Sequence, residues 1–379
     1  MDLKLKTMWP LAAASFVAFT SALCAAEGNQ KGDDMMPPSG QGPDMTITPS
    51  ANYKLRDPKG WFITGSVFYW NAHEDGLEFG ITDEANSGNR TIHDGEMENL
   101  DFHWDVGFKL GLGYRFDHDG WDLYANWTHF NTTAHEDESS GNCQGGGHVF
   151  FPLFTDLVPA DNMNQISASD VDAHWKLRLN LIDLELGRHF FVSKWLSVRP
   201  HMGLRAAWVK QHYDIDYSCL SNIDTDFHGS FVSDETEMTN KYTGLGVRGG
   251  FNTRWGLGSG WSIYGDAAIS LLYGRFHVHY EEDGKVAFAA SGSDVLDFED
   301  SFHATRAITD LGLGLMYEHT FNKAKWHLAV SLGWEHHLFF SQNQLWRVFG
   351  QAGAGSQTFT HERGDLGTQG WTLSARFDF

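Results

Sequence analysis

Apolar and polar residues alternate with a period of two along most of the chain after residue 60. The last nine residues show this most clearly, because Trp371, Leu373 and Phe377 alternate with polar or charged residues. Successive side chains of a β-strand point to opposite faces, so the pattern predicts strands whose two faces meet different environments. About ten such segments occur, roughly at 61–70, 103–116, 121–130, 174–191, 195–213, 241–255, 261–280, 303–320, 326–340 and 368–379.

The segment 174–191 changes phase in its middle. Its apolar residues are first odd-numbered and then even-numbered: Leu177, Leu179 and Leu181, followed by Ile182, Leu184 and Leu186. One extra residue in a strand returns the following side chains to the original face, so we expect a β-bulge near Leu181.

The connections between these segments alternate in length. Four are tight turns, at 117–120, 192–194, 256–260 and 321–325, and five are long, polar and acidic, at 71–102, 131–173, 214–240, 281–302 and 341–367. Short turns at one end and long loops at the other are typical of an outer-membrane barrel. We therefore predict an all-β fold, a transmembrane antiparallel up-and-down β-barrel of about 10 strands in the bacterial outer membrane. The terminal Phe379 on an amphipathic strand indicates recognition by the outer-membrane assembly machinery.

The tryptophans favour this barrel over a soluble β-sandwich, which would also alternate. A membrane location also requires the sheet to close into a barrel, because an open sheet edge would leave peptide groups unpaired in hydrocarbon. We expect two aromatic bands at the two membrane interfaces, although Trp70 and Trp195 lack the lipid-facing parity. One band lies beside the short turns (Trp61, Trp121, Trp195, Trp255, Trp261, Trp326) and the other toward the long loops (Trp70, Trp104, Trp127, Trp175, Trp208, Trp334, Trp371).

Composition narrows the function classes. The chain has 379 residues, a net charge of -22 and 3 cysteines. The acidic balance argues against nucleic-acid binding, and so few cysteines argue against a disulfide-stapled or zinc-ribbon protein. Lys4 and Lys6 precede an apolar stretch that ends at Leu23, and small residues follow up to an expected cleavage site near Ala26, which is the order of a secretory signal peptide. We expect a signal peptide over residues 1–26, a flexible polar periplasmic segment over 27–60, and the barrel over 61–379.

Two stretches resemble a known family. The run from Trp175 to Arg188, WKLRLNLIDLELGR, continues through LSVRPHMGLRAAW from Leu196 to Trp208, and GWFITGSVFYW opens the barrel at Gly60. These residues resemble the Legionella major outer membrane protein family, which also has relatives in chlamydia-like bacteria. The resemblance implies a pore-forming outer-membrane protein, with adhesion in some relatives, and it carries no catalytic motif.

The inward face is predicted to carry both signs of charge. We predict a porin-like function, the passive diffusion of small solutes and ions through a wet lumen. The alternative is a filled barrel in which these charges simply pair, since ten strands lie near the closed end of the size range. Glycines at inward positions, such as Gly107 and Gly113, favour extra room, and the acidic loops favour cations at the outer mouth. The predicted pore-lining residues are Lys109, Arg115, Lys176, Arg178, Asp183, Glu185, Arg199, Arg205, Arg248, Arg254, Asp266, Glu318, Glu335 and Arg376.

Other chemistry is weakly indicated. Cys143 and Cys219 fall in long loops, where they form a disulfide, cross-link to neighbours or stay free. His277 and His279 share one strand face but lack a carboxylate at ligand spacing, so we expect no metal. No cofactor motif is present, and membrane lipid and small solutes are the expected partners. The sequence leaves open whether the protein forms a homo-oligomer.

Two further classes remain as alternatives. One is a surface adhesin or structural envelope protein with a closed barrel, for which the long loop 131–173 supplies a Phe-rich patch. The other is an outer-membrane protease, which would gather histidine and aspartate at the extracellular rim: His129, His135, Asp137, His212 and Asp214. Because no spacing signature supports the protease, we expect that the protein is not an enzyme.

Overall fold

The computed structural model describes the barrel and part of its connections. It covers residues 50–51, 55, 59–84, 95–117, 119–139, 148–155, 166–222, 232–285, 293–351 and 356–379. The predicted signal peptide, most of segment 27–60, Cys143 and the side chain of Cys219 lie outside the described part.

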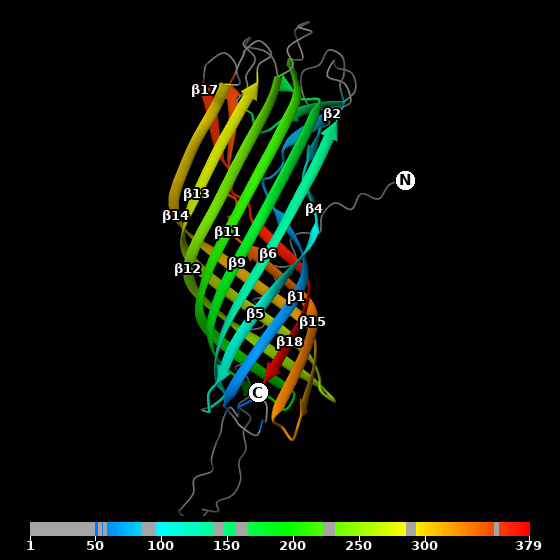
Figure 1. Cartoon of the computed structure of the whole chain (residues 1–379), viewed down its shortest axis with the longest axis vertical. Helices are drawn as coiled ribbons and strands as arrows, with labels where there is room; N and C mark the ends of the chain where they lie inside the picture. Colours follow the sequence, from blue (N-terminus) through cyan, green and yellow to red (C-terminus); the bar gives the residue numbers. More distant parts are fainter. Residues whose placement is uncertain are drawn as a thin grey trace, which may run out of the picture. The chain divides into compact units, whose positions relative to one another are not determined.

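Ten antiparallel strands close into a barrel, which confirms the predicted fold class (Figure 1). Each strand pairs with the next, and the last pairs with the first through thirteen register partners from Phe62↔Asp378 to Glu74↔Leu366. In order around the barrel the strands are β1 (Gly60–Glu74), β5 (Trp104–Arg115), β6 (Trp121–Ser139), β9 (Asp170–Arg188), β11 (Leu196–Asn222), β12 (Val232–Gly258), β13 (Trp261–Lys285), β14 (Ser293–Phe321), β15 (Trp326–Phe339) and β18 (Leu366–Asp378). Within the described residues, no helix is both long and apolar enough to cross a bilayer.

The remaining strands are short and belong to the connections. A three-stranded sheet joins β2, β3 and β7, and a hairpin joins β16 and β17. Their bounds are β2 (Gly80–Glu84), β3 (Glu96–Glu98), β4 (Asp101–Phe102), β7 (His148–Pro152), β8 (Ile166–Ser167), β10 (Phe190–Phe191), β16 (Trp346–Gln351) and β17 (Ser356–His361).

Most strands are longer than the sequence predicts, and five of them extend by five residues or more at one end. β6, β11, β12, β13 and β14 continue into segments predicted as loops, so 131–139, 214–222 and 293–302 are strand. The alternation does continue there, but the residues facing outward become polar. Outward apolar residues therefore mark only the part of each strand that faces lipid.

The outer surface of the barrel is apolar between two bands of aromatic residues. One exposed band lies beside the short turns (Trp61, Trp195, Trp255, Trp261, Tyr317, Trp326 and Phe379) and a second lies near mid-strand (Tyr69, Trp104, Trp127, Trp208, Tyr273, Trp334 and Trp371). Such bands mark the two interfaces of a membrane. We call the part between them the membrane half. Trp175, predicted to belong to the second band, is instead buried inside the barrel.

Beyond the second band, the strand segments 131–139, 170–180, 209–222, 232–243, 274–285 and 293–306 form what we call the crown. Their outer faces are polar, and their inner faces carry large apolar residues such as Tyr213, Ile215 and Phe276, all fully buried. Polar outside and apolar inside is the arrangement of a protein surrounded by water.

β9 contains no bulge near Leu181, so that prediction is wrong. Its residues pair one for one with β6 and with β11 through this point. The odd-numbered residues from Val171 to Gly187 consequently all point inward. The apparent slip arises because the inner face changes from apolar in the crown to charged in the membrane half, while the backbone register stays constant.

A candidate pore chamber inside the barrel

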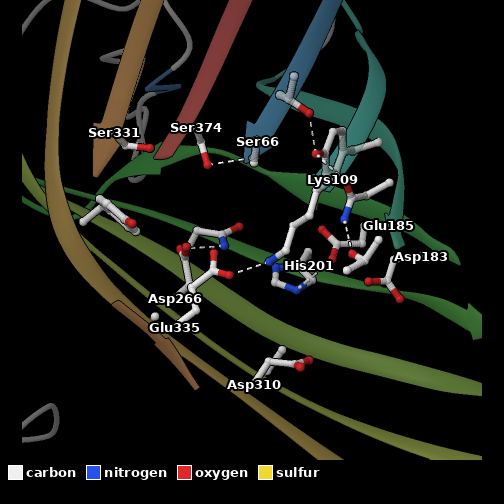
Figure 2. Close-up of a pocket in the computed structure, with 18 of the residues that line it drawn as sticks. Ser66, Lys109, Asp183, Glu185, His201, Asp266, Asp310, Ser331, Glu335 and Ser374 are labelled. Carbon is white, nitrogen blue, oxygen red and sulfur yellow. Dashed lines mark hydrogen bonds and ion pairs between the residues drawn. The ribbon is translucent and has the colours of Figure 1, made fainter. Parts of the chain in front are cut away.

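The membrane half encloses a cavity of about 330 Å³. Charged residues from β5, β9, β11, β12, β14 and β15 line much of its wall, and hydroxyl residues of β1, β15 and β18 line another part (Figure 2). We call this cavity the chamber. The sequence places charge here because the outer faces of these strand segments are given over to lipid, so polar residues fall on the alternate, inward positions.

Asp310 on β14 is the centre of one group of ion pairs. It accepts hydrogen bonds from Arg205 (Nη1 to Oδ2, 2.8 Å) and from the guanidinium of Arg248. His337 Nδ1 lies 2.6 Å from its other oxygen. Arg205 also binds both oxygens of Asp183, at 2.6 and 2.8 Å. Two cations therefore share this one buried carboxylate, which ties β11 and β12 to β14 and β15.

A second group centres on Glu185 of β9. Its carboxylate accepts from Arg248 Nε at 3.0 Å and from Arg199 Nη1 at 3.2 Å, and His201 Nε2 lies 3.5 Å away. Arg199 reaches further, to Asp122 on β6. The charges of the chamber thus pair across one to three strand positions around the barrel.

Lys109 and Glu335 form a bridge of similar reach to that between Arg205 and Asp310. Lys109 on β5 reaches into the chamber toward Glu335 on β15, with Nζ 2.6 Å from Oε2 (Figure 2). Two strands, β1 and β18, lie between these two in the barrel. The wall beneath the bridge carries small side chains, including Ser66 and Ser374, which share a 2.8 Å hydrogen bond. This wall leaves space that the opposite, charged wall does not.

Further pairs lie toward the short-turn end. Arg254 Nη1 donates to Glu318 at 2.7 Å, and Arg376 Nη2 donates to Asp378 at 2.9 Å. Arg115, only 1% exposed, lies 3.6 Å from the same Asp378. Charged groups therefore continue from the chamber to this end of the barrel.

Apolar side chains form the roof of the chamber. Trp70, Leu179, Leu181 and Phe339 line its crown side, and Lys109 Nζ lies 4.9 Å from the centroid of the Trp70 ring. Above them, connecting segments fold into the crown and bury apolar side chains against its inner face. We call these side chains the plug: Leu77, Phe79, Phe150, Phe154, Leu345 and Val348.

Single side-chain hydrogen bonds attach the plug segments to the barrel wall. Tyr213 Oη donates to the Leu77 carbonyl at 2.8 Å, and Tyr217 Oη donates to the Phe79 carbonyl at 2.7 Å. On the next strand, Asn240 Nδ2 donates to the Gln342 carbonyl at 2.9 Å. Thr236 Oγ1 also donates to the Phe154 carbonyl at 3.2 Å, and the Asp75 N–H donates to the Asp365 carbonyl at 3.1 Å. Within the described residues, these segments form no continuous ladder with the ten barrel strands.

Most predicted pore-lining residues lie on the inner face. Those that line the chamber are Lys109, Asp183, Glu185, Arg199, Arg205, Arg248, Arg254, Asp266, Glu335 and Arg376, and Arg115 and Glu318 lie inside near the short-turn end. Lys176 and Arg178 do not belong with them, because both lie on the outer face of the crown between the buried leucines of β9. Their assignment to the lumen rested on the bulge that β9 lacks.

The extra room predicted at inward glycines is absent at Gly107 and Gly113. The ring of Phe62 lies over Gly113 and that of Phe68 lies over Gly107, so closely that a Cβ on either glycine would overlap the ring. These glycines accommodate aromatic rings inside the wall. Sequence reasoning missed His201 and His337 as chamber residues, although His201 has the same strand parity as Arg199 and Arg205.

The outer wall of the crown holds four of the five residues considered for a protease, and His129 lies on β6 outside the crown. His135 and Asp137 lie on β6, whereas His212 and Asp214 lie on β11, with β9 between the two strands. His212 Nε2 is 3.1 Å from Asp214 Oδ1, and ligand atoms of both lie with one of Glu237 within 4.8 Å of one another. Burial and neighbouring carboxylates raise the pKa of Asp214. His212 and Asp214 share the outward face of β11 two residues apart, and Glu237 joins them from the paired strand β12, so the sequence shows the His212 and Asp214 pair but not its third member.

The sequence of the whole barrel matches one family model. Residues 56–379 match the family described as the Legionella pneumophila major outer membrane protein precursor. The chain belongs to this family. Its barrel therefore lies in the bacterial outer membrane, and the short turns are at the periplasmic side. No curated protein sequence matches the chain significantly.

Solved structures similar to this family member are other outer-membrane barrels. The outer membrane protease OmpT from Escherichia coli has 8% identity and a TM-score of 0.33, with 87% of this chain and 98% of that chain covered. Ail of Yersinia pestis has 11% identity and a TM-score of 0.23, covering 84% and 99%. A Pseudomonas aeruginosa FadL homologue has 7% identity and a TM-score of 0.23, covering 85% and 90%. Their different names give no guide to activity at such low similarity.

Proposed function

We propose that this protein is a porin-like channel held in a closed conformation, with the chamber as its conducting part and the plug as its gate. The observation that supports this most is the chamber itself. Its 330 Å³ has room for on the order of ten water molecules at about 30 Å³ each. Charged and hydroxyl groups along its wall replace part of the hydration shell of a passing ion or small polar solute.

The attachment of the plug supports a movable gate. Tyr213, Tyr217 and Asn240 each hold a plug segment by a hydrogen bond to one backbone carbonyl. A typical hydrogen bond contributes about 1 kcal/mol net, so these bonds add only a few kcal/mol to the cost of exposing the buried apolar side chains of the plug. Passage would require the plug to leave the crown while the strand ladders stay intact.

Single-channel recording in planar bilayers tests the proposal. The wild-type protein should show small, infrequent openings, and a variant with Leu77→Ala, Phe79→Ala and Phe154→Ala should open several-fold more often. Phe251→Ala is the matched control, because it truncates an exposed ring on the lipid face of β12 and should leave conductance unchanged. The net charge of -22 leads us to expect a reversal potential that favours cations.

A closed barrel that displays a binding surface is the second candidate. The filled interior of the crown favours it, because a packed core holds the crown's outer wall in a fixed shape beyond the membrane. If neither the wild type nor the plug variant gives channel events while cells carrying the protein still adhere to a partner surface, the porin proposal is wrong and the display function stands.

A further inference from the structure

Cations gather on the outer wall where the membrane half meets the crown. On four adjacent strands, the first or second outward position beyond the last exposed apolar residue is a lysine or arginine. These pairs of apolar and basic residues are Ile182 and Arg178 on β9, Trp208 and Lys210 on β11, Leu245 and Lys241 on β12, and Tyr273 and Arg275 on β13. The cations thus follow the boundary of the apolar surface from strand to strand.

The register places these cations side by side. Arg178 pairs with Lys210, and Lys210 pairs with Lys241, so three cations occupy one row across three strands. Partners in such a row have Cα atoms about 5 Å apart. Arg275 and Lys176 lie one outward position from this row, on β13 and β9. We call Lys176, Arg178, Lys210, Lys241 and Arg275 the cation patch.

No member of the cation patch has an anionic partner within the part of the chain that the structure describes. Arg178, Lys210, Lys241 and Arg275 are exposed. Like charges on neighbouring strands repel one another, which costs stability unless an anion from outside the chain lies between them. The absence of an internal partner is notable in a chain of net charge -22.

On these strands the outward acidic residues lie further from the membrane than the row of Arg178. Two outward positions beyond the row of Arg178, the register row reads His135, His174, Asp214, Glu237, Glu281 and Asp297 across six strands. On the opposite wall, the outward residues Asn71, His336 and Gln369 replace lysine and arginine. The cations are therefore confined to one level relative to the membrane and to one side of the barrel.

We propose that the cation patch binds the phosphate groups of a phosphorylated lipid in the outer leaflet. Headgroup phosphates lie just outside the hydrocarbon, which is the level of the patch relative to Trp208 and Tyr273. Lysine and arginine pair with phosphate oxygens by charge-assisted hydrogen bonds. The exposed apolar residues Ile182, Leu204 and Leu245 continue directly from the patch toward the membrane centre and would contact the acyl chains of the same lipid. This inference does not depend on whether the barrel conducts.

Binding of bisphosphorylated lipid A to the full-length protein, refolded in dodecyl maltoside micelles, tests the proposal. The triple variant Arg178→Gln, Lys210→Gln, Lys241→Gln should bind about a hundredfold more weakly, given the usual contribution of each basic residue near an anionic surface. Dephosphorylated lipid A should bind the wild type at least about tenfold more weakly than the bisphosphorylated form, by the same reasoning.

The matched control removes three exposed lysines at the other end of the barrel. Lys194→Gln, Lys323→Gln and Lys325→Gln change the net charge equally but lie in the short turns, so binding should equal that of the wild type. Heat-dependent mobility on gels verifies folding of both triple variants. Unchanged binding by the patch variant, or an equal loss in the control, would overturn the proposal. Complete displacement of the lipid by inorganic phosphate at equal concentration would show a simple phosphate site and contradict the lipid assignment.

Discussion

The membrane half and the crown are built from the same strands with opposite polarity. On β11, the membrane half has Leu204 outside and Arg205 inside, whereas the crown has Asp214 outside and Ile215 inside. The ladder between β11 and β9 runs through both halves without a break. The strand geometry is therefore common to both halves, and the surrounding solvent decides which face is apolar.

The two halves are therefore held together by different forces. Lipid surrounds the membrane half, so burying apolar side chains inside it would gain little, and paired charges such as Asp310 with Arg205 occupy the interior instead. Water surrounds the crown, so Tyr213, Phe276 and the plug gain the full benefit of apolar burial. The same kind of substitution on the same strand face should therefore change the free energy of unfolding differently in the two halves.

Breaking the charge pairs of the membrane half should have the largest effect. Asp310→Ala would remove the carboxylate that Arg205 and Arg248 share and leave each arginine with one fewer anionic partner, and removing one partner of a buried pair typically costs about 3–5 kcal/mol. Urea unfolding from lipid vesicles measures the loss. Asp137→Ala, at a position 82% exposed on the crown, should change the free energy of unfolding by less than about 0.5 kcal/mol. Equal losses would contradict the contrast between the halves.

Charge on the outer face should distinguish the halves directly. Val247→Arg and Thr239→Arg place the same side chain on the outward face of β12, in the membrane half and in the crown respectively. The first should destabilise the barrel by about 2–4 kcal/mol, because arginine then meets lipid, and the second should be close to neutral. The same unfolding assay compares them, and a neutral Val247→Arg would place that surface in water.

A buried acid in the crown should make its stability depend on pH. Burial raises the pKa of Glu74 to about 8, even though Gln211 donates to both of its oxygens at 2.6 Å. The folded pKa exceeds the unfolded value of 4.5, so the folded state retains a proton that the unfolded state releases. The contribution of Glu74 to the free energy of unfolding is therefore fully present below pH 4.5 and is lost as the pH rises toward 8.

Unfolding at pH 6 and pH 9 measures this loss, expected at about 2 kcal/mol. Glu74→Gln should remove the difference between the two pH values, because the amide cannot ionise. If the variant kept the full pH dependence, Glu74 would not be its source.

The sequence alone predicts the membrane half well. Its outward apolar residues and the aromatic bands give ten strands in order, and the strand parity of Arg199, Arg205 and Arg248 places them inside. The crown was predicted poorly, because a strand whose polar face points outward reads as a loop once the outer face is assumed to be apolar. The family resemblance through residues 175–208 is confirmed by the match over residues 56–379.

Errors at the site have the same origin. Lys176 and Arg178 were assigned to the lumen because their leucine neighbours were taken to face lipid, and only the unbroken ladder of β9 corrects this. The plug could not be predicted either, since Leu77 and Phe154 enter the crown through contacts with strands distant in sequence. A period-two pattern shows that side chains alternate between two faces, but it does not show whether lipid or water lies against each face.

Spin labels on β9 test the inversion most directly. In a background without Cys143 and Cys219, labels replace Leu184, Arg178 and Leu179 in turn, and collisions with oxygen and with a water-soluble nickel chelate are measured in vesicles. The account predicts that the label at Leu184 meets oxygen in lipid, the label at Arg178 meets nickel in water, and the label at Leu179 meets neither. Oxygen collisions at Leu179 as frequent as at Leu184 would mean that the strand slips near Leu181, and would contradict a single register through both halves.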